Sequence, residues 1–150
     1  MSEPCHLRSW LADYAAATTE SPIESMMLMA LLAIRAYMEH RSTRPEALNL
    51  RIEQQARVGS YRVDFMLSID GFKAKVGVEC DGHDFHERTK AQAAHDKKRD
   101  RAITAKGITL QRYTGSEIYR DPFACAEEAV DQILALVTDE LYELSKRKVS

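Results

Sequence analysis

A run of alternating apolar and polar residues, interrupted by two turn signals, constrains the fold of this chain more than any other feature. Residues 48–58 and 61–69 both carry the alternation, and the pair Gly59-Ser60 separates them. This arrangement is typical of a β-hairpin. Asp70-Gly71 is a second turn signal, and residues 73–81 follow it with the composition of a third strand. The region therefore predicts a three-stranded meander.

Helical patterns flank the meander. Residues 5–17 have the spacing of a short amphipathic helix, and Ser21-Pro22-Ile23-Glu24 has the residues expected at a helix start. Residues 87–106 have helical composition, and Gly107 is placed to end that helix. Residues 108–113 read as a fourth strand, and Asp121-Pro122 begins a last helix. The predicted order α-α-β-β-β-α-β-α indicates an α/β fold with a mixed four-stranded sheet flanked by helices.

Length and composition favour one domain. The chain has 150 residues, is 45% hydrophobic and has a net charge of -2, so we expect a single domain over 1–150, with a core at about 21–120 and a C-terminal helix at 121–147. Three widely spaced cysteines without a C-x-x-C pair argue against a disulfide framework and favour the cytoplasm. No apolar run approaches the ~20 residues that cross a bilayer, so no membrane contact is expected.

Acidic residues lie where two of the predicted strands would meet. Asp64 lies within the second strand, and Glu79 and Asp81 end the third. Because side chains of a strand alternate between faces, Glu79 and Asp81 should point away from the face that carries Val78 and Cys80. Three carboxylates so close would repel, and a divalent cation with oxygen ligands is the usual remedy. A polar strand face in water is the alternative.

Two histidines, His83 and His86, follow the acids directly. Histidine titrates near neutral pH, so either can serve as a general base or proton donor. An alternative is a zinc half-site made by Cys80 and both histidines, with a carboxylate as fourth ligand. The strand pleat opposes zinc, because the Cys80 side chain should point into the core when Glu79 and Asp81 point outward.

Several short motifs follow one another along the predicted elements. They are Tyr61-Arg62-Val63-Asp64-Phe65, Glu79-Cys80-Asp81-Gly82, His86, Asp96-Lys97-Lys98-Arg99, Arg112 and, upstream, Glu24. As a set, they resemble the core of the PD-(D/E)-x-K nuclease superfamily, and residues 61–117 resemble the domain family related to the very-short-patch mismatch-repair endonucleases. Two departures stand out. Asp81 occupies the position of the superfamily's lysine, in agreement with this subfamily, and the zinc cysteines of the mismatch-repair enzyme are missing.

The resemblance implies a Mg²⁺-dependent endonuclease, with Mn²⁺ as a substitute, acting on DNA in repair, restriction, toxin or homing systems. Asp64, Glu79 and the main-chain carbonyl of Cys80 would bind the metal, and Asp81 and His86 would complete the catalytic group. The alternative is a catalytically silent nucleic-acid-binding module. Glu24 equally fits a helix-capping role, since Ser21 and Glu24 have capping-box spacing. The supporting residues expected around the site are Glu24, Gln54, His83, Asp96 and Arg99. Gln55 is the alternative to Gln54, because the sequence gives no way to choose which face of the first strand approaches the phosphate.

A basic helix is expected to contact the phosphate backbone. Residues 87–106 follow the acidic cluster along the chain and contain seven basic and three acidic side chains. This local excess of positive charge makes the helix the best candidate for contact with phosphates. A solvated helix of mixed charge would have the same composition. The residues expected to bind nucleic acid are Arg88, Lys90, Lys97, Lys98 and Arg112.

The last helix carries a narrow apolar seam. Its residues recur at alternating steps of four and three, which favours packing on the sheet over a coiled-coil contact in a homodimer. A role as an oligomerisation unit is the remaining alternative. The seam consists of Val130, Leu134, Val137, Leu141 and Leu144.

Overall fold

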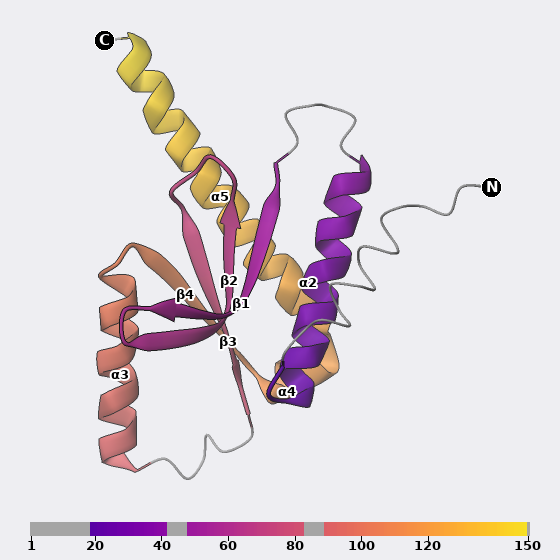
Figure 1. Ribbon diagram of the computed structural model, residues 1–150, viewed down its shortest axis with the longest axis vertical. Helices are drawn as coiled ribbons and strands as arrows, with labels where there is room; N and C mark the ends of the chain where they lie inside the picture. Colours follow the sequence, from indigo (N-terminus) through magenta and orange to yellow (C-terminus); the bar gives the residue numbers. More distant parts are fainter. Residues whose placement is uncertain (1–18, 42–47, 83–88, 150) are drawn as a thin grey trace, which may run out of the picture.

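The computed structural model describes residues 19–41, 48–82 and 89–149 (Figure 1). The helix predicted at residues 5–17 lies outside them. Within the described ranges the predicted elements are present, with bounds shifted by a few residues at several ends. In chain order they are α2 (Pro22–Arg41), β1 (Leu50–Val58), β2 (Tyr61–Ile69), β3 (Lys75–Asp81), α3 (Lys90–Thr104), β4 (Ile108–Thr114), α4 (Gly115–Arg120) and α5 (Pro122–Val149).

The sheet has the strand order β1-β2-β3-β4. The first three strands are antiparallel neighbours, and β4 pairs parallel with β3 after the crossover through α3. This arrangement confirms the predicted mixed α/β sheet. The short helix α4 was not predicted, although Thr114 and Glu117 form a capping box at its start. Gly107 has a φ of 79° and follows α3, as expected for a helix stop.

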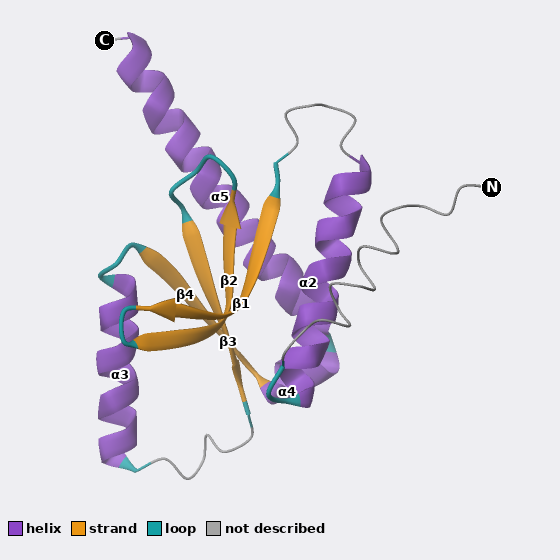
Figure 2. Ribbon diagram, viewed as in Figure 1, coloured by secondary structure: helices purple, strands orange, loops and turns teal. Residues whose placement is uncertain are grey.

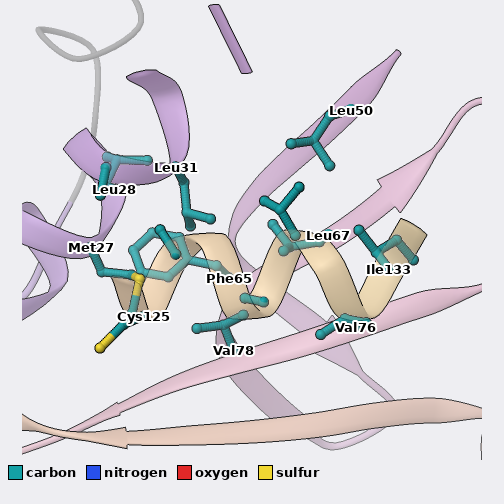
Figure 3. Close-up of a cluster of buried hydrophobic side chains, with 14 of the residues drawn as sticks. Met27, Leu28, Leu31, Leu50, Phe65, Leu67, Val76, Val78, Cys125 and Ile133 are labelled. Atoms are coloured by element: carbon teal, nitrogen blue, oxygen red, sulfur yellow. The ribbon is translucent and has the colours of Figure 1, made fainter. Parts of the chain in front are cut away.

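Helices cover both faces of the sheet (Figure 2). The larger cluster of buried side chains joins the sheet to α2, α4 and α5. Figure 3 shows its centre, where Met27 and Leu31 of α2 and Ile133 of α5 lie around Phe65 and Leu67 of β2. A smaller cluster lies on the opposite face, where Ile103 of α3 packs with residues of β1, β2 and β4. The sheet is therefore the middle layer of three.

The β1–β2 hairpin bends between these two layers. In β1, Leu50 belongs to the larger cluster and Ile52 packs against it, whereas Ala56 and Val58 belong to the smaller one. Residues two apart on a regular strand share one face, so the alternation is broken between them. Gln55 lies at the break with a φ of 50°. The hairpin tip consequently packs on the side of α3, toward which it points in Figure 1.

The first half of α5 packs on the sheet, as predicted. Val130 and Val137 are buried in the larger cluster, and Leu134 packs against it. Leu141 and Leu144 lie farther along the helix and are 49% and 46% exposed. A homodimer contact through this exposed end stays a prediction. None of the helices within the described ranges has the length and apolar character of a membrane-spanning segment.

Candidate active site

The predicted acidic residues lie at one end of the sheet. β3 ends at Asp81 and its parallel neighbour β4 ends at Thr114, so the carboxyl ends of these strands share an edge. Asp64 lies at the bend of β2, one residue before the β2–β3 pairing begins with Phe65 opposite Val78. Strand register and the hairpin bend therefore bring Asp64 to the level of Glu79.

Asp64 is half-buried and bonded to the neighbouring strand. Its Oδ2 accepts a hydrogen bond of 2.7 Å from the backbone N–H of Cys80. Burial raises the pKa of the Asp64 carboxyl, the Cys80 N–H opposes that rise, and the charge of Glu24 adds to it. Cys80 directly follows Glu79, so this bond holds the Asp64 carboxylate on the backbone beside Glu79.

Glu79 is 8% exposed and pairs with a cation from another element. The guanidinium of Arg99, on α3, donates to Glu79 Oε1 and, at 2.6 Å, to the backbone carbonyl of Arg62. Burial and then the charge of Asp64 raise the pKa of Glu79 to about 7, against the opposing effect of Arg99. The charge of Asp64 therefore acts on Glu79 directly, as expected for two carboxylates that share one patch.

Asp81 is fully engaged by arginine. Arg112 Nε and Nη2 each donate to one oxygen of Asp81 at 2.9 Å, while Nη1 donates to both oxygens of Asp100 on α3 at 3.0 Å. The hydrogen bonds from Arg112 to Asp81 raise the pKa of that guanidinium. The arrangement ties β3, β4 and α3 together. Asp81 thus acts as a partner of Arg112, which the sequence placed in contact with nucleic acid.

Glu24 combines the two roles that the sequence left open. Ser21 Oγ donates to Glu24 Oε1 at 2.9 Å and accepts from the Glu24 backbone N–H at 3.3 Å, as in a helix cap. Glu24 is nevertheless 7% exposed, and its Oε2 accepts from the Gln55 amide on β1 at 3.0 Å. The start of α2 is in this way bonded to the sheet beside Asp64.

The remaining predicted site residues lie on β1, β3 or α3, or fall outside the described ranges. The Cys80 side chain packs against the larger core cluster, as the strand pleat predicted, and burial raises the pKa of its thiol. Asp96 is half-buried on α3. Lys90, Lys97 and Lys98 are exposed on that helix. The predictions for His83, His86 and Arg88 fall on residues outside the described ranges.

Sequence reasoning missed one residue of this site, Asp100, which is the second carboxylate partner of Arg112. Of the two neighbouring glutamines considered from the sequence, Gln55 and not Gln54 reaches Glu24. Both glutamines have a buried Oε1 without a hydrogen-bond partner among the described residues. The bend at Gln55 accompanies this difference between the two glutamines, and the local sequence carries no signal for the bend.

The residues suit a divalent cation in kind and number of donors. In the described part of the chain, no group of three or more His, Cys, Asp or Glu side chains is arranged to hold a metal ion. Magnesium, however, is usually bound through one or two carboxylates with several waters. Asp64 and Glu79 supply two carboxylates, and burial followed by the charge of Asp64 raises the pKa of Glu79. The main-chain carbonyl of Cys80, predicted as a third ligand, is an oxygen donor of the kind that magnesium prefers.

Comparison with known proteins identifies the family of this domain. The family model REase_MTES_1575, which describes a restriction-endonuclease-like domain, matches residues 43–133, more than half of the chain. The match includes all four strands, α3 and α4. Searches of curated proteins and of solved structures found no match. The chain belongs to the REase_MTES_1575 family of restriction-endonuclease-like domains.

Proposed function

We propose that this protein is a metal-dependent endonuclease that hydrolyses phosphodiester bonds in DNA. One observation carries the proposal: in a restriction-endonuclease-like domain, the half-buried carboxylate of Asp64 and the buried carboxylate of Glu79 lie at the same level of two neighbouring strands. Adjacent buried carboxylates are costly in a folded protein. Such an arrangement is expected where both act on a shared ligand.

Asp64, Glu79 and the main-chain carbonyl of Cys80 would hold Mg²⁺, or Mn²⁺ in its place. When bound, this ion supplies positive charge beside the scissile phosphate and acidifies the attacking water. The chain itself positions the two carboxylates, Asp64 through the Cys80 N–H and Glu79 through Arg99. The predicted catalytic role of His86 stays a prediction, since it lies outside the described residues.

Arg99 would supply the fixed positive charge that the superfamily's lysine normally supplies. Asp81 occupies the position of that lysine and is itself acidic, so position 81 supplies no positive charge. Both oxygens of Asp81 accept hydrogen bonds from Arg112. Arg99 instead brings a guanidinium to Glu79 from α3, with its side chain 15% exposed. Its bond to the backbone carbonyl of Arg62 fixes its direction. A guanidinium in this position is suited to contact a phosphate oxygen.

The outer face of α3 would contact the DNA backbone. Lys90, Lys97 and Lys98 are exposed there, while Arg99 and Asp100 of the same helix face the sheet. Phosphate contacts by lysine give affinity without sequence preference. We therefore expect DNA binding that weakens steeply as salt concentration rises.

Cleavage of supercoiled plasmid tests the proposal. Nicked or linear DNA should appear with Mg²⁺ or Mn²⁺ and disappear when the metal is chelated, because the carboxylates need the ion to act on phosphate. Circular DNA has no ends, so its cleavage identifies an endonuclease. A Glu79→Gln preparation purified in the same way should be inactive. Equal cleavage by that preparation would assign the activity to a contaminant or to a different site.

A second candidate function is a catalytically silent nucleic-acid-binding module. It is favoured by the observation that Glu79 and Asp81 each pair with an arginine, so their charges are compensated without an ion. This function predicts that the protein binds DNA in a gel-shift assay, cuts none with either metal, and binds equally well after Glu79→Gln. Metal-dependent cleavage by the wild type but not by Glu79→Gln would exclude the silent module.

The substitution Arg99→Gln separates the two tasks of that residue. Removing the guanidinium frees Glu79 Oε1, so Mn²⁺ affinity measured by calorimetry should stay equal or rise severalfold. Plasmid cleavage should instead fall by about 10² to 10³, as for removal of one donor that stabilises developing charge. Arg101→Gln, an exposed position on the same helix, is the matched control. A parallel fall in metal affinity and cleavage would show that Arg99 acts only by positioning Glu79 and does not contact the phosphate.

A further inference from the structure

Gln55 has a backbone conformation that its side chain does not favour. Its φ of 50° is the only positive value for a residue other than glycine in the described ranges. The left-handed region is unfavourable for an L-residue and persists only where surrounding structure imposes it. The ladder pairs Gln54 with Phe65 and Ala56 with Val63, so Gln55 lies level with Asp64. The strained residue is therefore placed at the candidate site.

The side chain of Gln55 joins the sheet to the start of α2. Its Nε2 donates to Glu24 Oε2 at 3.0 Å. The other described donors to the Glu24 carboxylate are the backbone of Glu20 and the hydroxyl of Ser21, both at the start of α2. The hydrogen bond from Gln55 therefore fixes the Glu24 carboxylate to the sheet. In this position the charge of Glu24 acts on Asp64.

The Gln55 bond holds Glu24 on the strand that pairs with the strand of Asp64. The two carboxylates repel, and the charge of Glu24 contributes to the raised pKa of Asp64. A bond that holds like charges together costs stability in the absence of a cation and favours binding of one. The buried Oε1 of Gln55, which has no partner among the described residues, adds a further oxygen acceptor there.

We propose that Gln55 is a positioning residue that fixes Glu24 beside Asp64 and thereby increases the affinity of the site for a divalent cation. This inference rests on the proposed function, because it requires that Asp64 belong to a cation site. Gln55 acts through the Glu24 carboxylate. Its left-handed backbone turns the amide from the strand toward α2.

A purely structural role for Gln55 makes a different prediction from a positioning role. Asparagine adopts the left-handed region more readily than glutamine, so Gln55→Asn should keep the bend and relieve strain. Its amide is one methylene shorter and should not reach Glu24. We expect Gln55→Asn to melt at the same temperature as the wild type or a few degrees higher without metal. Its cation affinity should fall by about 10- to 100-fold, the usual effect of removing a residue that orients a metal ligand.

The experiment measures Mn²⁺ binding by titration calorimetry and metal-free melting by circular dichroism. Gln132→Asn on α5 is the matched control, because it makes the same substitution in a half-buried glutamine outside the candidate site. Asp64→Asn reports on the cation site itself. The proposal expects weak binding by Gln55→Asn, wild-type binding by Gln132→Asn, and wild-type or higher stability for Gln55→Asn.

Two results would overturn the inference alone: wild-type affinity in Gln55→Asn while Asp64→Asn binds no Mn²⁺, or an affinity loss in Gln55→Asn that accompanies an equal loss of metal-free stability. The second result would identify a structural role. Gln55→Gly, which has no side chain and favours the same backbone, should match Gln55→Asn in affinity. Absence of Mn²⁺ binding in the wild type would instead overturn the metal-dependent function and the inference with it.

Discussion

Replacement of Asp64 by asparagine is expected to reduce DNA cleavage by more than about 100-fold without loss of the fold. Removing a group that merely orients a metal ligand costs about 10- to 100-fold, so removing a ligand should cost more. The amide oxygen of asparagine can still accept the 2.7 Å bond from the Cys80 N–H. Burial disfavours the charged form of Asp64, so the neutral variant should be at least as stable as the wild type.

The measurement is plasmid cleavage with Mg²⁺, accompanied by thermal melting and calorimetric titration with Mn²⁺. Asp139→Asn on α5 is the matched control, because it removes one exposed carboxylate far along the chain from the site. It should leave cleavage, stability and metal affinity unchanged. Unchanged or higher stability together with lower cleavage activity in Asp64→Asn would identify Asp64 as a functional carboxylate. Retention of both cleavage and Mn²⁺ affinity by Asp64→Asn would contradict the metal site.

Local signals predicted most of the described fold. The bounds of β2 agree with the sequence prediction at Tyr61 and Ile69, because turn residues delimit a regular alternation there. The helix α4 was missed because six residues are too few to show helical periodicity, although Thr114 and Glu117 carried the capping signal. The bend at Gln55 could not be predicted, since glutamine has no special preference for a positive φ.

The candidate site was predictable where it depends on strand pleat and pairing. Alternation placed Glu79 and Cys80 on opposite faces, and hairpin order placed Asp64 in the neighbouring strand. The partners of these acids depend on tertiary packing. Arg99 reaches Glu79 from α3 across twenty positions of sequence, and Arg112 reaches Asp81 through the parallel pairing of β3 with β4. No local pattern specifies which acid each arginine contacts.

Replacement of Arg112 by methionine is expected to have the largest effect on stability, a loss of about 2 to 3 kcal/mol. Removing one partner of a buried ion pair costs about 3 to 5 kcal/mol, because the remaining charge stays buried and uncompensated. Partial exposure reduces the cost here, since the side chains of Arg112, Asp81 and Asp100 are 24%, 10% and 34% exposed. Methionine retains the apolar stem, so the change reports mainly on the lost hydrogen bonds. Urea denaturation of the metal-free protein measures it.

The double variant Arg112→Met/Asp81→Asn distinguishes an uncompensated charge from lost packing. It should be more stable than Arg112→Met, because the neutral amide no longer leaves a buried carboxylate without its arginine. Asp81→Asn alone should cost less, since Arg112 keeps both of its bonds to Asp100. The same single variant tests the predicted catalytic role of Asp81. If Asp81 serves only to hold Arg112, the cleavage activity of the Asp81→Asn protein should fall no more than the fraction of that protein that is folded. Loss of cleavage by a fully folded Asp81→Asn protein would instead place this carboxylate in the reaction.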